Sequence, residues 1–271
     1  MKKTTLLLLT STFALLSGCK KDSPKDDDTK ASEDNAYALS IFENTVSLAD
    51  EAGYTSSPYT GNLSGAGVVV TYDTLNSANE DTITINFGTT GSTGIDSRVR
   101  VGKVIIKYTG NYADSASDHT ITFQNYKVDG NQVIGTLTVL DTGLNAAGKT
   151  VFKINANAEI VLTTGGTIIW YSEIYREWTA GQTTLNYWDD DVYTVTGNCS
   201  GAQSTGPTFV SQINVPLIRT FIPGCRRHFS KGGFQLHSTD KSLRTVDFGS
   251  GTCDDVATVK IDDQTYTINL H

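Results

Sequence analysis

One stretch of the chain, residues 168–178, decides the fold, and it reads Ile168-Ile169-Trp170-Tyr171-Ser172-Glu173-Ile174-Tyr175-Arg176-Glu177-Trp178. Its even-numbered positions are mainly apolar, whereas the odd-numbered positions from Tyr171 to Glu177 carry tyrosine or glutamate. Successive side chains of a strand point to opposite faces of a sheet. The alternation therefore predicts a β-strand with one buried face and one face in water.

The segments before this stretch alternate in the same way. Residues 151–162 lead into it through a turn at 163–166, where two glycines can take the positive φ of a tight hairpin. An earlier hairpin, formed by strands at 119–128 and 133–139, turns at Asp129-Gly130. Alternation on one face favours antiparallel strands, because parallel strands are usually buried on both faces.

Residues 31–53 are the one helix that the sequence predicts. Apolar residues recur there at three- and four-residue spacing, namely Ala36, Leu39, Phe42, Val46 and Ala49. Ser32 and Asp34 are candidate caps at its start, and Gly53 is a candidate stop. We expect this amphipathic helix to rest its narrow apolar stripe on the sheet.

Strand patterns continue to the end of the chain, giving roughly twelve to fifteen strands, more than one open sheet usually holds without curling or splitting. The sequence predicts an all-β fold: an antiparallel up-and-down meander that forms a strongly curved sheet, a flattened barrel or a two-layer sandwich. No linker divides residues 35–271, which we interpret as a single β domain.

The chain opens with an export signal at residues 1–18. Two lysines precede an apolar core that is too short to span a bilayer. Leu16-Ser17-Gly18-Cys19 resembles the bacterial lipobox, in which cleavage falls before the cysteine. The resemblance implies a diacylglycerol thioether and an N-acyl chain on Cys19, and more than one chain anchors a protein stably. The alternative is an ordinary secretory signal with a chance cysteine.

Residues 19–34 are polar and predict a disordered tether. Lysine at position 20 resembles the signals that sort lipoproteins to the outer membrane of diderm bacteria. Lys25-Asp26-Asp27-Asp28 resembles the surface-export signal of Bacteroidota lipoproteins, although a plain spacer is the alternative. We therefore expect a lipid anchor in the outer membrane, with the body on the periplasmic or the cell-surface side.

The charge of the chain limits its partners. The formal net charge of −8 becomes −10 once cleavage removes Lys2 and Lys3. An acidic protein is repelled by nucleic acid phosphates and by anionic lipid headgroups. We therefore expect contact with the membrane through the lipid anchor and no binding of nucleic acid.

Three cysteines remain after Cys19, an odd number for an oxidising compartment. We favour a Cys225–Cys253 disulfide, because each residue lies beside a strand end, with Cys199 free or buried. A metal site is the alternative, but the spacing of Cys225 to nearby histidines is not typical of zinc. Phosphate-loop and dinucleotide motifs are absent as well, so we expect no metal and no cofactor.

No pattern of catalytic residues stands out. The chain has four histidines and no Gly-x-Ser-x-Gly elbow, so a hydrolytic triad is not indicated. Glu173 and Glu177 are the least poor candidates for a pair of glycosidase carboxylates, and a solvated strand face explains them more simply. We expect a protein that is not an enzyme.

Binding is better supported, because all three tryptophans and several tyrosines fall between residues 170 and 193. Aromatic surfaces suit sugar rings and apolar ligands. Trp170 and Trp178 share a face with isoleucines, which favours the core, so we take Trp188, Tyr187 and Tyr193 as the candidate ligand-binding residues.

Several motifs together resemble an uncharacterised lipoprotein family of Bacteroidota. They are Trp170, Arg176-Glu177-Trp178, Asp190-Asp191-Val192-Tyr193, Pro216-Leu217-Ile218-Arg219, and the segment 246–254 with the hairpin that follows it. The likeness covers most of the chain from the helix onward, and its motifs are structural, so it implies no activity. It implies that cysteines matching Cys225 and Cys253 recur; a further pair near the first strands, common in that family, is missing here.

These observations predict a membrane-anchored outer-membrane lipoprotein that acts as a non-catalytic binding or adhesion module at the cell envelope. Its ligand is expected to be a glycan, a protein or a lipid. The alternative is an envelope-assembly protein or lipid carrier, and a carbohydrate-active enzyme is less favoured.

Overall fold

The computed structural model describes residues 25–55, 65–73, 80–185 and 187–270. The predicted signal at 1–18, the lipidation candidate Cys19 and the first part of the predicted tether lie outside the described residues.

Over these ranges a single α-helix precedes a long series of strands. The elements are α1 (Lys30–Thr55), β1 (Val69–Asp73), β2 (Asp81–Asn86), β3 (Ser92–Thr93), β4 (Val99–Tyr108), β5 (Asp118–Val128), β6 (Asn131–Leu144), β7 (Thr150–Val161), β8 (Thr167–Ala180), the 3-10 turn η1 (Trp188–Asp190), β9 (Val192–Ala202), β10 (Thr208–Thr220), β11 (Lys231–Ser238), β12 (Leu243–Ser250), β13 (Val256–Ile261) and β14 (Gln264–Asn269).

The strands form one 14-stranded sheet whose order follows the chain from β1 to β14, with short β3 paired to β4 beside this path. Neighbouring strands are antiparallel throughout, for example β7 with β8 and β8 with β9. The sheet does not close on itself, since β1 and β14 are its two ends. The predicted all-β, up-and-down meander is confirmed in its strongly curved, single-sheet form.

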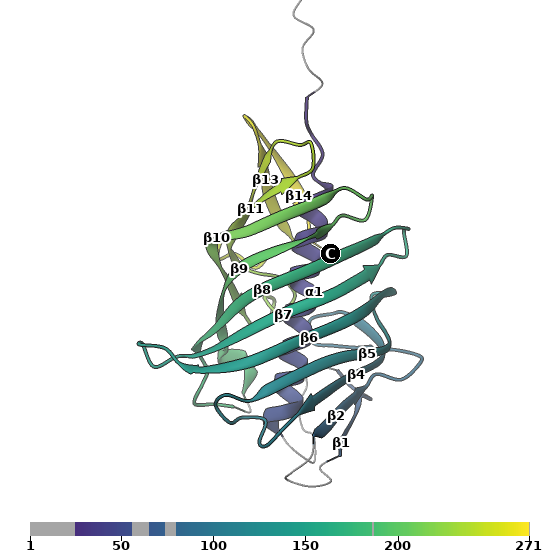
Figure 1. The fold of residues 1–271 in the computed structure, drawn as a ribbon, viewed down its shortest axis with the longest axis vertical. Helices are drawn as coiled ribbons and strands as arrows, with labels where there is room; N and C mark the ends of the chain where they lie inside the picture. The colour runs from purple at the N-terminus through teal and green to yellow at the C-terminus, as the bar shows by residue number, and fades with distance from the viewer. Residues whose placement is uncertain (1–24, 56–64, 74–79, 186, 271) are drawn as a thin grey trace, which may run out of the picture.

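Figure 1 shows how the helix and the sheet fit together. The chain enters at the top, α1 descends, and the strands return upward from β1 and β2 at the bottom to β13 and β14 at the top. The strands cross α1 obliquely and follow one another along its length. The helix therefore lies along the concave side of the sheet for most of the length of the molecule.

The predicted helix exists, but its environment is not the one we expected. It is buried on every side: 21 of its 26 residues are buried, polar ones included. The apolar stripe predicted that only one face of the helix would be buried. The curved sheet encloses its polar faces as well. The helix is the centre of the core rather than a cover on the sheet.

The start of the helix also corrects the sequence analysis. It begins at Lys30, so residues 30–34 are helical and not the end of a disordered tether. The amide of Lys30 donates to the carboxylate of Asp28 at 3.0 Å, so the capping side chain lies before the predicted ones. Ser32 and Asp34 are buried inside the helix instead.

Trp170 joins the helix to the centre of the sheet. Its indole ring is fully buried and stacks on Phe42 of α1 with ring centroids 4.9 Å apart. Its Nε1–H donates to the side-chain oxygen of Asn35 at 2.9 Å. The amide nitrogen of Asn35 in turn donates to Ser211 of β10 at 3.1 Å. One asparagine of the helix is therefore bonded to two strands, β8 and β10.

Arginines on the inner side of the protein meet the polar groups of α1. Five are among the largest fully buried side chains, namely Arg98, Arg100, Arg176, Arg219 and Arg244. A buried charge is costly unless it is paired and hydrogen-bonded. The helix supplies part of that pairing, because Arg98 donates to Ser40 at 2.8 Å and Arg219 donates to Asn44.

Arg176 of β8 has the most extensive set of partners. Its guanidinium lies 2.9 Å from the Asp50 carboxylate and 3.7 Å from that of Glu43. It also donates to Ser47 at 3.2 Å and lies over the ring of Tyr193, 3.6 Å from the centroid. Three consecutive turns of α1 are thereby bound to one side chain of the sheet.

Glycines permit the sharp curvature of two long strands. Gly135 in β6 and Gly197 in β9 have φ of 120° and 124°, values that other residues rarely adopt. A Cβ at either position would lie 2.3 Å from a carbonyl oxygen of the neighbouring strand. The absence of a side chain therefore lets the neighbouring strand approach closely at both positions.

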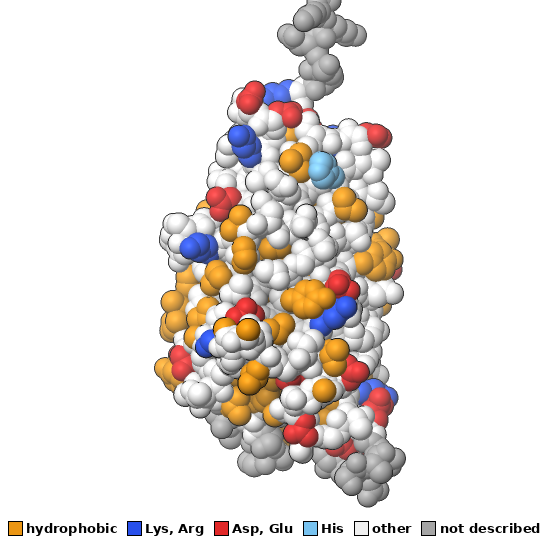
Figure 2. All heavy atoms as spheres, turned by 60° about the vertical axis from the view of Figure 1, so that its left-hand side comes forward, with side chains coloured by type: hydrophobic (Ala, Val, Ile, Leu, Met, Phe, Trp, Pro, Cys, Tyr) orange, Lys and Arg blue, Asp and Glu red, His pale blue; other side chains and the backbone are white. Residues whose placement is uncertain are grey.

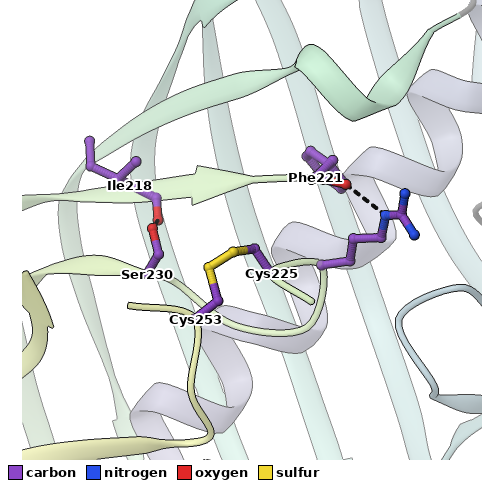
Figure 3. The surroundings of a disulfide bond; sticks show 6 residues. Ile218, Phe221, Cys225, Ser230 and Cys253 are labelled. Atoms are coloured by element: carbon purple, nitrogen blue, oxygen red, sulfur yellow. Dashed lines mark hydrogen bonds between the residues drawn. A yellow bond between two sulfur atoms is a disulfide. The ribbon is translucent and has the colours of Figure 1, made fainter. Parts of the chain in front are cut away.

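The predicted disulfide is present. Cys225 and Cys253 are bonded, with Cα atoms 4.9 Å apart, and Cys199 is free and buried. Figure 3 shows that the bond joins the segment after β10 to the segment after β12. In the first segment, Arg226 donates to the carbonyl of Phe221 at 2.6 Å. The cross-link therefore joins the β10–β11 connection to the β12–β13 connection.

Replacing Arg176 by alanine tests the importance of the helix–sheet ion pairs. Arg176→Ala leaves Asp50 and Glu43 buried without their cation, so we expect a loss of about 3–5 kcal/mol in the free energy of unfolding. Urea denaturation followed by tryptophan fluorescence measures it.

The matched control is Lys107→Ala, since Lys107 forms an exposed pair with Glu80. That change should cost less than about 1 kcal/mol. Equal losses for the two variants would contradict the role given to Arg176.

Candidate functional site

The predicted aromatic site does not assemble on the surface. Trp188 and Tyr193 are 5% and 0% exposed, and only Tyr187, at 58%, faces solvent. Trp188 lies in η1 and contacts the edge of Phe221, with centroids 6.3 Å apart, so it fills the core at the strand ends. Tyr193 points inward from β9 and stacks on Trp178 at 5.5 Å. The prediction that these residues form an exposed ligand platform is wrong.

Glu173 and Glu177 do not have the geometry of a glycosidase pair. They lie four residues apart on β8, which corresponds to roughly 13 Å along a strand, whereas such carboxylates act at about 5–10 Å. Glu173 forms an ion pair with Lys153 at 2.8 Å, and this hydrogen bond lowers the pKa of the Glu173 carboxyl. A carboxyl held ionised is a poor proton donor, so this pair gives no support to catalysis.

The alternative of a metal site at the cysteines is also unsupported. Cys225 and Cys253 are bonded to each other, so neither thiol can act as a ligand. Within the described ranges, no group of three or more His, Cys, Asp or Glu side chains is arranged to hold a metal ion.

A different site appears on the outer face of the sheet, where a shallow hollow of about 530 Å³ crosses β8, β9, β10 and β11. We call it the outer trough and define it by the side chains Tyr171, Glu173, Asn198, Ser200, Val210, Gln212, Gln235 and His237. A second hollow of about 560 Å³ shares Tyr171, Ser200 and Val210 and continues it toward Thr208. On the face shown in Figure 2, uncharged surface predominates and charged side chains are scattered.

Strand register arranges the outer trough in two parallel rows. One row runs Tyr171, Ser200, Val210, His237, and the other runs Glu173, Asn198, Gln212, Gln235. Members of a row are direct cross-strand partners, so they are spaced by about 4.8 Å, the distance between strands. Side chains from four separate strands thus lie in two regular rows on one surface.

The hollow exists because the outward side chains of β9 are small. Asn198 and Ser200 form the floor, while Tyr171 on β8 and Gln212 on β10 rise on either side. The short outward side chains of β9 therefore leave a depression in this part of the outer face.

The groups in the outer trough are available to a ligand. Tyr171 is 45% exposed, and no described aromatic or cationic group stacks on its ring. By contrast, Lys153 lies over the ring of neighbouring Tyr175, 5.8 Å from its centroid. Among the described hydrogen bonds, none uses the side-chain amides of Asn198, Gln212 or Gln235. The trough thus offers an open aromatic face and unbonded amides together.

From this set, the sequence singled out Tyr171 and Glu173 as parts of a strand face suited to water, and Glu173 also as a candidate glycosidase carboxylate. The other members lie on three strands whose alternation was recognised but whose mutual register was not. The signal for this row was the pairing expected in the β9–β10 and β10–β11 hairpins. Counting outward positions back from the two turns places Asn198, Gln212 and Gln235 opposite one another.

Comparisons with known proteins add no further assignment: no family model, no curated protein and no solved structure matches the chain. A search of the described residues also finds no helix with the length and apolar character needed to cross a membrane.

Asp191, next to η1, is a buried carboxylate with a shifted pKa. Its Oδ1 accepts a hydrogen bond from Trp178 Nε1 at 3.0 Å. Burial is the main cause that raises the pKa of Asp191 to about 7. The hydrogen bond from Trp178 and the charge of Arg176 oppose this shift, and Asp190 and Asp50 add to it. The carboxyl therefore takes up a proton near neutral pH in the folded protein but only in acid in the unfolded chain.

This shift predicts how stability depends on pH. Because the folded state binds the Asp191 proton more tightly, that contribution is complete below the ordinary pKa of 3.8 and is lost progressively as pH rises to the folded pKa of about 7. Between about pH 4 and about pH 7 the urea midpoint of the native protein should fall relative to that of Asp191→Asn, and above about pH 7 the difference should stay constant. Asp263→Asn, an exposed carboxylate in the turn between β13 and β14, is the control and should behave as the native protein. Identical pH profiles for all three proteins would exclude this origin.

Proposed function

We propose that this chain is an exported bacterial lipoprotein, held at the outer membrane through acyl groups on Cys19, that binds a ligand in the outer trough without catalysing a reaction. The Cys225–Cys253 disulfide supports export, since structural disulfides persist in oxidising compartments. The lipobox-like sequence before Cys19 supports the anchor.

The way the chain enters the fold supports an orientation on the membrane. Asp26 accepts hydrogen bonds from the amide of Ser242 at 3.1 Å and from Arg244 at 2.9 Å, beside β12. Cys19 and Asp26 are seven Cα–Cα steps apart, with six residues between them, a reach of at most about 25 Å. An anchor on Cys19 therefore keeps the β12 end close to the bilayer and leaves β1 and β2, at the opposite end in Figure 1, farthest from it.

The observation that carries the binding proposal is the outer trough. Four strands present an open aromatic ring and three unbonded amides around a hollow. These side chains point away from the core. Binding sites commonly combine an apolar surface with a few converging polar groups.

A lipid carrier is less well supported. A carrier of this shape needs room for an acyl chain on the concave side of the sheet. That side is occupied by α1, whose residues are buried along nearly its whole length. The polar bonds from Asn35, Ser40 and Asp50 to the rest of the protein hold the helix there.

Metabolic labelling tests the anchor. Radiolabelled palmitate should be incorporated into the native protein and not into Cys19→Ala, because the acylated thiol is removed. Cys199→Ala, which removes a buried thiol elsewhere, is the control and should label normally. Labelling of Cys19→Ala, or none of the native protein, would rule the anchor out.

Filling the hollow tests the binding site. Ser200→Trp places a large side chain on the floor of the outer trough, whereas Thr138→Trp places one on the exposed side of β6 outside it. The mature lipoprotein in detergent micelles is passed over immobilised polysaccharides and immobilised peptides. We expect retention of the native protein and Thr138→Trp by at least one class, and loss of retention by more than about tenfold for Ser200→Trp.

Circular dichroism of each variant establishes that the sheet is intact. Retention that is unchanged in a folded Ser200→Trp protein would place the ligand elsewhere, and no retention of the native protein by either class would contradict the binding function.

A further inference from the structure

We infer that the ligand of the outer trough is a neutral oligosaccharide that lies across the strands with a sugar ring on Tyr171. The inference rests on the proposed binding function and assigns its ligand class. Three properties of the trough lead to it: an open aromatic face, a row of amides, and the absence of an unpaired charge among its described side chains.

The aromatic face is the first. Tyr171 is exposed at the edge of the hollow, and the apolar C–H face of a pyranose ring fits against a tyrosine ring. Val210 lies two strands away in the same row, is 59% exposed and adds apolar surface beside Ser200. A ligand that is amphipathic, with apolar ring faces and polar edges, matches this row.

The amides are the second. Asn198, Gln212 and Gln235 are consecutive cross-strand partners, and each side chain carries a carbonyl acceptor and two N–H donors. Vicinal hydroxyls of a sugar both donate and accept, so an amide can bond two of them at once. From Glu173 to Gln235 the row spans three strand spacings, about 14 Å, which accommodates a short oligosaccharide rather than a single small molecule.

Charge is the third. Glu173 is the only acidic side chain that lines the hollow, and it is paired with Lys153; neither Lys nor Arg lines it. An anionic ligand would need a cation to replace its hydration, and the described lining offers none except a histidine. A neutral chain of hydroxyls requires no such partner.

Affinity electrophoresis of the mature lipoprotein in detergent tests the assignment. Gels contain a neutral polysaccharide (mixed-linkage β-glucan, xylan, galactomannan or amylose) or a uronic-acid polysaccharide (alginate or polygalacturonate). We expect at least one neutral polymer to retard the native protein, equally at about 0.05 M and about 0.5 M NaCl, because no ion pair is formed. Tyr171→Ala should weaken retardation by about tenfold, and Gln212→Ala by several-fold.

The control is Tyr187→Ala, which removes an exposed tyrosine outside the trough and should be retarded like the native protein. If only uronic-acid polymers or peptides bind, and Ser200→Trp abolishes that binding, the trough is a binding site but its ligand is not neutral. If a neutral polymer binds and Tyr171→Ala leaves it unchanged, the assignment to Tyr171 is overturned. If Ser200→Trp affects no ligand at all, both the inference and the proposed binding function fail.

Discussion

The fold depends on the burial of a polar helix by a sheet that carries the matching charges. α1 could not lie in an apolar core, because Glu43, Asp50 and several amides and hydroxyls would lose their hydration without replacement. The inward face of the sheet could not collapse on itself either, because it carries arginines such as Arg176. Each element supplies what the other needs, so the helix and the sheet are expected to form in one cooperative step.

This division of the sheet into two faces leaves the outer face free for function. The inward positions of β8 include Trp170, Ile174 and Arg176, all of which are buried, and Trp170 and Arg176 are bonded to α1. The outward positions between them make no contribution to the core. Side chains there can change with little effect on folding, which is why an aromatic ring and a row of amides can be carried on β8 to β11 without disturbing the fold.

The strands were predictable because alternation is a local property. The hairpin at Asp129-Gly130 was read from two residues, and both adopt the positive φ that such a turn requires. The enclosure of the helix was not predictable in the same way, since a stripe of apolar residues indicates one buried face and says nothing of polar faces. A signal did exist: Arg176 occupies the apolar side of its strand, and a charge at an inward position requires a buried partner.

The candidate site was missed for a related reason. A cluster of aromatic residues in sequence, such as Tyr187, Trp188 and Tyr193, says little about exposure, because alternation and a short 3-10 turn direct two of the three inward. The outer trough is a property of register, in which residues up to 66 positions apart, from Tyr171 to His237, become neighbours in one row. Register follows from turn geometry and bulges along the whole meander, and β10 is one of several strands whose pairing with both neighbours contains shifts. The shifts of β10 lie beyond Ile213, so the rows of the trough follow from the hairpins alone, whereas the hollow between them also depends on the curvature of the sheet around α1.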